Sequence, residues 1–101
     1  MQIGCDIVEN KRLKNKNKRF IDLVLTKKEQ VLYKTEGLPF LTGRFAAKEA
    51  IMKCLNNTKD MNFLDIEILK DDNGAPITNI ADISISISHE KDYTISFAIK
   101  K

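Results

Sequence analysis

Two stretches near the C-terminus decide the fold: Ile83-Ser84-Ile85-Ser86-Ile87-Ser88-His89 and, after a short polar segment, Tyr93-Thr94-Ile95-Ser96-Phe97-Ala98-Ile99. Bulky and small side chains alternate in both stretches, and a period of two residues is typical of β-strands. The polar residues 89–92 predict the turn of an antiparallel hairpin. We expect the bulky side chains to belong to the core. We expect the small side chains to lie against a closely packed helix or a second subunit.

Further towards the N-terminus, the sequence predicts one long helix. It begins at Thr42 or Gly43, ends near Leu55 and is rich in alanine, which has the highest helix propensity. The polar residues 56–60 end it. The preceding segment Lys34–Leu41 contains a glycine and a proline, and we expect it to be a loop.

The N-terminal third predicts a strand followed by shorter helices. Met1–Val8 alternates as a strand would, with Asp6 near its end. Lys11–Tyr33 looks helical in pieces. Within it, Thr26 and Glu29 have the spacing of a capping box, in which each side chain accepts the backbone N–H of the other residue.

Between the long helix and the last hairpin, the sequence predicts a second, smaller hairpin. Residues 64–68 alternate as a half-buried strand, and the turn residues 71–76 lead into a partner strand at 77–80. The order of strand, helices and then several strands predicts an α+β fold with a mostly antiparallel sheet. A chain of 101 residues has room for one domain, which would cover residues 1–101.

The composition indicates a globular protein of a reducing compartment. Hydrophobic residues make up 43% of the chain, and no apolar run approaches the roughly 18 residues that cross a bilayer. The N-terminus lacks the pattern of a secretion signal, so we expect a cytoplasmic protein without a membrane partner. Cys5 and Cys54 are then expected to be free, buried thiols. The single histidine, His89, excludes a zinc site of several Cys and His ligands. It is either a ligand-binding residue at a strand end or an exposed turn residue.

Positive charge gathers in one segment of the chain. The net charge is only +3, but residues 11–19 hold six basic side chains and no acidic one: Lys11, Arg12, Lys14, Lys16, Lys18 and Arg19. Such a cluster can attract a negatively charged partner. A solvated helix or loop surface would have the same composition, so both interpretations stay open.

Two carboxylates form a candidate metal site. Asp6 is flanked by apolar residues, so its charge needs a partner. Glu49 shares a helix face with Lys53, four residues later. Magnesium binds one or two protein carboxylates together with water and phosphate oxygens, and Arg44 and Lys48 would add positive charge for a phosphate-bearing substrate. The alternatives are an ordinary helix-surface pair for Glu49 and Lys53, and a helix cap for Asp6.

Four segments resemble, in order, the motifs of a known enzyme family. They are Gly4-Cys5-Asp6-Ile7-Val8-Glu9 followed by Arg12, Gly43-Arg44-Phe45-Ala46-Ala47-Lys48-Glu49-Ala50 followed by Lys53, Asn73-Gly74-Ala75-Pro76, and Ile87-Ser88-His89. The chain resembles the holo-[acyl-carrier-protein] synthases, which are 4′-phosphopantetheinyl transferases. The second segment is the most specific of the four, and together they extend from the first strand to the last hairpin.

The resemblance implies an activity, a fold and an assembly. Such enzymes move 4′-phosphopantetheine from coenzyme A to a serine of apo acyl carrier protein, giving holo acyl carrier protein and 3′,5′-ADP. The reaction depends on magnesium and serves fatty acid biosynthesis in the cytoplasm. The family has a mostly antiparallel α+β fold and works as a homotrimer with substrate sites between subunits.

The resemblance also implies roles for individual residues. Asp6 and Glu49 would bind Mg²⁺ and, with Lys53, carry out catalysis. The proton of the substrate serine would go to Glu49 or to a metal-bound water. Coenzyme A would contact a second set: Arg44, Asn73, Gly74, Pro76 and His89. The acyl carrier protein would dock on the segment 12–20 through four residues: Arg12, Lys16, Arg19 and Phe20.

Two departures from the family pattern concern the nucleotide. Ala75 stands where the family usually has a lysine, which removes one phosphate contact. Residues 77–82 are fewer than usual, because a helical segment common in the family is shortened here. Neither departure touches Asp6, Glu49 or Lys53.

Two other classes of function remain as alternatives. A small basic module could bind RNA or another polyanion through residues 11–19, or the chain could be a structural protein that only assembles. The aromatic residues are scattered rather than interleaved with the basic ones, which argues against RNA recognition. We therefore expect no nucleic-acid partner.

Overall fold

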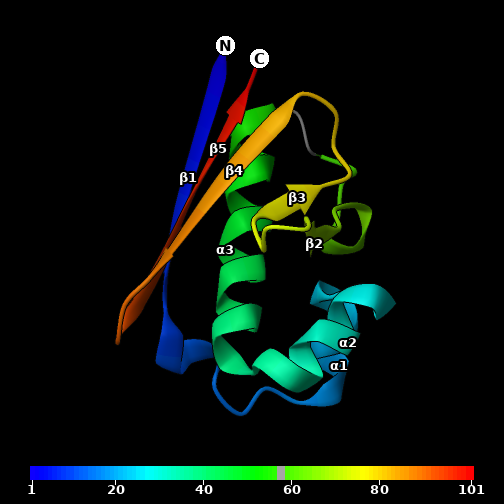
Figure 1. Ribbon diagram of the computed structural model, residues 1–101, viewed down its shortest axis with the longest axis vertical. Coiled ribbons are helices and arrows are strands. Elements are labelled where there is room, and N and C mark those ends of the chain that lie inside the picture. The colour runs from blue at the N-terminus through cyan, green and yellow to red at the C-terminus, as the bar shows by residue number, and fades with distance from the viewer. Residues whose placement is uncertain (57–58) are drawn as a thin grey trace.

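The computed structural model describes residues 1–56 and 59–101. A three-stranded antiparallel sheet forms one layer, and the long helix α3 (Leu38–Leu55) lies along one of its faces (Figure 1). The strands stand in the order β1 (Gln2–Glu9), β5 (Tyr93–Lys100), β4 (Ile83–His89). This architecture confirms the predicted α+β fold and the C-terminal hairpin.

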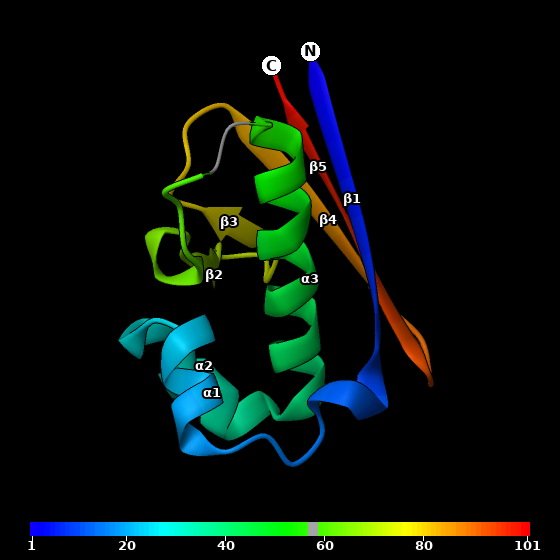
Figure 2. The same ribbon diagram turned by 180° about the vertical axis from the view of Figure 1, so that it is seen from behind.

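The remaining elements lie on the side of α3 away from this sheet, as Figures 1 and 2 show. They are a two-stranded hairpin and two short helices: β2 (Ile68–Lys70), β3 (Pro76–Thr78), α1 (Lys18–Val24) and α2 (Lys27–Glu36). Two 3₁₀ turns, Asn10–Leu13 and Phe63–Asp65, complete the regular structure of the described residues. No helix among them is long and apolar enough to span a membrane.

Small residues let α3 approach the sheet closely. A Cβ atom on Gly4 of β1 would lie 2.1 Å from the carbonyl oxygen of Ala50, so only glycine fits there. On β5 the residues beneath α3 are Thr94, Ser96 and Ala98, all fully buried. The small side chains of β5 therefore pack against a helix, one of the two predicted possibilities.

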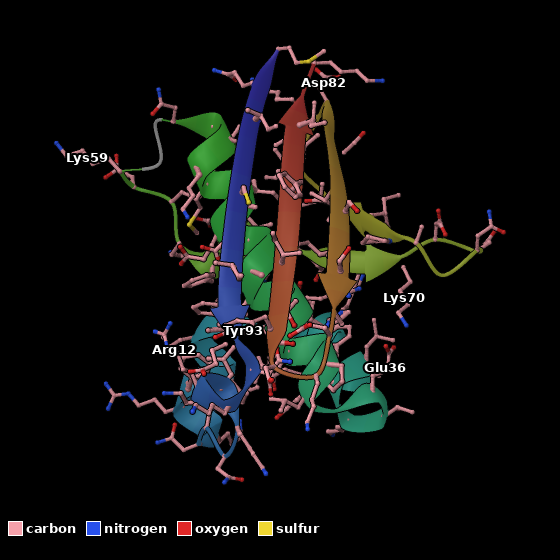
Figure 3. The ribbon with its side chains drawn as sticks, turned by 90° about the vertical axis from the view of Figure 1, so that its left-hand side faces the viewer. Arg12, Glu36, Lys59, Lys70, Asp82 and Tyr93 are labelled. Carbon is pink, nitrogen blue, oxygen red and sulfur yellow. The ribbon has the colours of Figure 1, made fainter. Side chains whose placement is uncertain are left out.

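The bulky side chains of β5 point the other way, which corrects the prediction that they belong to the core. Together with residues of β1 they form an exposed apolar surface, the outer sheet face, whose most exposed members are Ile3, Ile7, Tyr93, Phe97 and Ile99. Figure 3 looks onto this face, and no described element covers it. The isoleucines of β4 do point inwards: Ile83, Ile85 and Ile87 are half-buried and pack against the core on the flank of α3.

The two cysteines lie on opposite sides of β1. Cys54 is buried under the strand, whereas Cys5 is exposed on the outer sheet face, and both are free thiols. The prediction of free thiols is confirmed. The prediction that both are buried is wrong for Cys5, because its strand turns this residue away from α3.

Helix α3 begins earlier than predicted. Lys34–Leu41 was expected to be a loop, but α2 continues to Glu36 and α3 starts at Leu38 instead of Thr42 or Gly43. Gly37, with φ of 73°, supplies the whole connection. The proline at position 39 lies in the first helical turn, where a missing N–H costs nothing.

Of the remaining predictions of local structure, most are confirmed and one is wrong. The capping box of Thr26 and Glu29 is present, and 71–76 forms the predicted turn. Residues 64–68 are not one strand, because Asn62 caps the 3₁₀ turn and β2 begins only at Ile68. Helix α3 ends at Leu55 as predicted, with Asn56 in a left-handed conformation, while residues 57–58 of the expected break lie outside the described residues.

Candidate active site

Asp6, Glu49 and Lys53 come together where β1 passes α3, and we call them the carboxylate cluster. The Lys53 ammonium lies 3.0 Å from Asp6 Oδ1 and donates to the carbonyl of Cys5, also at 3.0 Å. The Asp6 side chain is only 15% exposed. Burial raises the pKa of the Glu49 carboxyl, and the charge of Asp6 raises it further against the opposing effect of Lys53.

This geometry decides between the interpretations of these residues. Lys53 pairs with Asp6, and no ion pair with Glu49 is found among the described residues, so the two are not an ordinary helix-surface pair. Asp6 does not cap the following turn, whose cap position is Glu9. Two repelling carboxylates beside a single ammonium fit an added cation.

The number of donors indicates which cation fits. The described residues contain no group of three or more His, Cys, Asp or Glu side chains that could hold a metal. Two carboxylates are too few for a closed protein cage but suit Mg²⁺, which keeps waters and takes substrate phosphates as ligands. The residues present therefore fit magnesium bound together with a phosphate ligand.

Lys48 is not near this cluster, contrary to the sequence-based expectation. Its side chain is fully buried and its ammonium lies 2.6 Å from Glu29 Oε1, with further bonds to the carbonyls of Val24 and Phe63. Burial lowers the pKa of Lys48, and the bond to Glu29 opposes that shift. Adjacent helix residues point about 100° apart, so Lys48 turns into the core while Glu49 faces β1.

A second site lies by the edge strand β4, in a cavity of about 340 Å³. We call it the Arg44 cavity, and it is lined in part by Phe40, Arg44, Lys70, Gly74, Pro76 and His89. The Arg44 guanidinium donates to the carbonyls of Ile68 and Leu69 at 3.0 and 3.1 Å. It lies over the Phe40 ring, 4.1 Å from the centroid. These contacts hold a buried cation that has no carboxylate partner within 4.0 Å among the described residues.

His89 borders the same cavity and rests on α3. A Cβ on Gly43 would come within 3.1 Å of the imidazole Cε1, so the missing side chain makes room for the ring. Burial lowers the pKa of His89, and the charge of Arg44 lowers it further. His89 is exposed as predicted for one of its two interpretations, but it ends strand β4 rather than lying in a turn, and its Nδ1 lies 3.1 Å from the Thr94 hydroxyl.

The turn 71–76 borders the cavity with Gly74 and Pro76, while Asn73 is exposed on the turn. Asp71 holds the turn, because its Oδ1 accepts the backbone N–H groups of Asn73 and Ala75 at 2.8 and 2.9 Å. Sequence reasoning did not single out Asp71, although an Asp that starts a turn is a recognisable signal.

Lys70 is a cavity residue that the sequence motifs missed. It pairs with Pro76 across the β2–β3 hairpin, and its ammonium lies 2.6 Å from Glu36 (Figure 3). It thus provides a lysine next to the turn where Ala75 has none. Only the strand register, which the sequence does not show, reveals this position.

The basic segment follows directly on β1. Arg12, Lys16 and Arg19 are exposed. Phe20 is half-buried and stacks on Phe45 with ring centroids 6.2 Å apart, one helical turn before Glu49. The segment therefore begins just after the strand that carries Asp6 and reaches α3 at Phe45. Two of its other lysines are neutralised locally, Lys11 by Glu9 and Lys18 by Asp22.

A family model described as the 4′-phosphopantetheinyl transferase superfamily matches residues 2–98. The chain belongs to this superfamily. A holo-[acyl-carrier-protein] synthase of Geobacillus is 44% identical over 96% of this chain and 92% of its own length. One of Mycoplasma capricolum is 43% identical over 98% and 93%. The chain is therefore an enzyme, a phosphopantetheinyl transferase, and the alternative of an RNA-binding module is not supported.

Solved structures lead to the same family. A holo-(acyl-carrier-protein) synthase from Bacillus anthracis in complex with CoA (3′,5′-ADP) has a TM-score of 0.87 and 35% identity, over 96% of this chain and 92% of the other. The Helicobacter pylori enzyme in complex with coenzyme A has a TM-score of 0.85 and 33% identity, over 96% and 97%.

In this transferase, the predicted site residues form two groups on opposite sides of α3. Glu49 and Arg44 are five residues apart, which turns them about 140° from each other on an α-helix. β1, with one carboxylate, and β4, with the histidine, are the two edges of the sheet. Figure 3 shows Arg12 below the end of β1, and Lys70 with Glu36 beyond the edge of β4. A single chain therefore does not place the carboxylate cluster beside the Arg44 cavity.

Proposed function

We propose that this transferase moves 4′-phosphopantetheine from coenzyme A to a serine of apo acyl carrier protein, releasing 3′,5′-ADP, with Mg²⁺ bound by Asp6 and Glu49. The carboxylate cluster is the observation that carries the proposal. Its three side chains come from two of the four recognised motifs and meet in space although 47 residues separate Lys53 from Asp6. The relatives named above are called synthases of the holo carrier protein.

The cluster can perform the chemistry of phosphoryl transfer. Such a reaction needs positioning and neutralisation of charge more than covalent participation by the protein. Asp6 and Glu49 would hold Mg²⁺, which would supply that neutralisation. Lys53, held by the Cys5 carbonyl and Asp6, adds a fixed positive charge. The proton of the serine hydroxyl would go to Glu49 or to a metal-bound water beside it.

We assign coenzyme A to the Arg44 cavity. Arg44 and Lys70 bring positive charge to it, and the 71–76 turn with Gly74 and Pro76 forms one wall. Asn73 on the same turn and His89 complete the predicted set. Two solved relatives were crystallised with coenzyme A or its nucleotide part.

The two half-sites require a second copy of the chain, and we propose a homotrimer. A neighbouring subunit that brings its Arg44 cavity to the carboxylate cluster would complete the site. The outer sheet face offers the surface for it, since Ile3, Ile7 and Phe97 are 66%, 59% and 43% exposed. A contiguous apolar patch of this kind on a small protein marks an interaction surface. The threefold symmetry rests on the family resemblance alone.

The enzyme is placed in the cytoplasm by this proposal. Its two thiols are free in the structure, as a reducing compartment would keep them. The acidic partner, the carrier protein, would meet the exposed side chains of Arg12, Lys16 and Arg19, which follow the strand that carries Asp6.

The test is to replace each carboxylate without changing its shape. Apo acyl carrier protein, coenzyme A, magnesium and the enzyme are mixed, and mass spectrometry follows the gain of one phosphopantetheine. Asp6→Asn and Glu49→Gln should lower the rate by a factor of about 100 or more, as loss of an electrostatic catalytic group does. Asp60→Asn, an exposed carboxylate after α3, is the matched control and should keep the rate. A near-normal magnesium-dependent rate for Glu49→Gln would contradict the metal assignment.

A further inference from the structure

The hydroxyl of Thr94 is the centre of a polar network that the catalytic proposal does not use. Thr94 is fully buried beneath α3. Its Oγ1 lies 2.7 Å from Asn10 Oδ1, 3.0 Å from the Thr42 hydroxyl and 3.1 Å from His89 Nδ1. Three elements far apart in sequence therefore meet at one hydroxyl.

The orientation of the Asn10 amide is determined by its other contacts. Its Nδ2 donates to the backbone carbonyls of Glu90 and Lys91, at 3.0 and 3.1 Å. The reverse orientation would place the amide oxygen against two carbonyl oxygens. Asn10 Oδ1 therefore faces Thr94, and an amide oxygen can only accept.

The single proton of the Thr94 hydroxyl must point to Asn10, because that contact is the shortest and its acceptor has no proton of its own. Towards His89 the hydroxyl then has only lone pairs. An unprotonated Nδ1 at 3.1 Å would set two lone pairs against each other. A hydrogen bond exists there only if His89 Nδ1 carries the proton and donates it.

We propose that Thr94 and Asn10 are positioning residues that hold His89 with Nδ1 protonated, so that Nε2 is the proton-accepting atom presented to a phosphate of the ligand in the Arg44 cavity. The ring borders this cavity, and Nε2 has no protein partner within the described residues. The identity of the ligand as coenzyme A rests on the proposed function, whereas the tautomer does not.

The charges around the ring determine what the fixed tautomer does. Arg44 and Lys70 bring positive charge to the cavity, Glu36 brings negative charge, and Glu90 follows His89 in the turn. Burial and Arg44 lower the pKa of His89, so the empty site holds a neutral ring without a proton on Nε2.

A bound phosphate reverses that balance, because its negative charge offsets Arg44 and favours the imidazolium. Nε2 then takes up a proton from solvent and donates it to a phosphate oxygen. Binding is therefore linked to proton uptake and tightens as the pH falls. The opposite tautomer would donate from Nε2 at once, with no uptake.

The chain has one histidine, so nitrogen NMR of the imidazole reports this ring alone. Above its pKa, the wild-type protein should show a protonated Nδ1 and an unprotonated Nε2. Asn10→Ala frees the Thr94 proton to bond Nδ1 and should shift the proton to Nε2. Thr94→Val removes the hydroxyl and should shift it likewise. Thr42→Val is the matched control, since it removes the other hydroxyl at Thr94 and should leave the wild-type tautomer.

The tautomer decides the proposal without any ligand. A protonated Nε2 in the wild-type protein overturns it, and so does an unchanged tautomer in folded Asn10→Ala or Thr94→Val. If neither variant folds, the wild-type spectrum alone decides.

Calorimetry with coenzyme A supplies the second readout. Wild-type affinity should rise as the pH falls from 8 to 6, by at most about tenfold per pH unit for one proton. Asn10→Ala should flatten this rise. The phosphate of coenzyme A titrates in the same way in both measurements, so the difference between the two proteins reports His89. An equal pH dependence in both overturns the link to binding. Absence of coenzyme A binding in the wild-type protein would instead contradict the proposed function and leave the tautomer result in force.

Discussion

At the scale of single residues, two glycines leave space that a neighbouring group occupies. Gly4 lets β1 touch the backbone of α3, and Gly43 gives the His89 ring its place on the same helix. Both matter for the space they leave rather than for backbone freedom. Each therefore links the packing of α3 to one half of the active site, Gly4 beside Asp6 and Gly43 beside Arg44.

Gly43→Ala should separate ligand binding from stability. The new Cβ would lie 3.1 Å from His89 Cε1 and 3.3 Å from Ile87 Cγ2, so the ring must move. The KM for coenzyme A should rise on the order of tenfold, because misplacing a contact group is costly. Alanine also favours a helix by about 1 kcal/mol over glycine, and this gain offsets the strain of moving the ring. The free energy of unfolding measured in urea should therefore change little. An unchanged KM would mean that the position of His89 does not matter for binding.

At the scale of elements, one buried ion pair ties α3 to its surroundings. Lys48 bonds the end of α1, the cap of α2 and the 3₁₀ turn at Phe63, while Glu29 Oε2 accepts the N–H of Ile68 in β2. Every charged atom of the pair thus has a partner. Removal of one member would leave the other buried and uncompensated.

Lys48→Met should destabilise the fold, whereas Lys53→Met should not. Lys48 is fully buried, and loss of its charge should cost about 3–5 kcal/mol in the free energy of unfolding. Lys53, on the same helix but 55% exposed, should change that free energy by only about 0.5 kcal/mol while abolishing turnover. Urea unfolding at one protein concentration and a rate assay measure both. Equal unfolding midpoints for the wild type and Lys48→Met would refute the role given to this pair.

At the scale of the whole molecule, assembly of several copies of the chain would explain both the exposed outer sheet face and the division of the active site. Light scattering at micromolar concentration should report about three times 11.5 kDa. Phe97→Glu places a charge in that face and should give a folded, inactive monomer. Val31→Glu, an exposed apolar residue on α2, is the control and should remain assembled and active. A fully active monomer would overturn the proposed trimer.

The basic segment should recognise the carrier protein rather than coenzyme A. Arg12→Glu with Lys16→Glu should raise the KM for the carrier protein and flatten its salt dependence, since attraction between surface charges is screened over roughly 8 Å at physiological salt. The KM for coenzyme A should change little. Lys28→Glu with Lys34→Glu makes the same charge change on α2 and should leave both constants alone. Loss of coenzyme A affinity alone would place the segment in the nucleotide site.

The sequence by itself determined the family, the last hairpin, the capping box at Thr26 and the end of α3. Each depends on neighbours in the chain: a period of two residues, a cap three residues away, or a contiguous motif such as 43–50. The identities of Asp6 and Glu49 as site candidates were visible for the same reason.

Only the tertiary structure decided which faces are buried and which residues meet. Alternation separates two faces of a strand, but where α3 rests decides which one is inside, and the small face of β5 allowed the closer approach. Lys48 was assigned to the wrong environment because its partner Glu29 lies 19 residues away. The contact of Thr94 with Asn10 spans 84 residues, and the separation of the active site into two halves follows from the positions of β1 and β4 at opposite edges. Such contacts depend on packing in space, which no local pattern in the chain records.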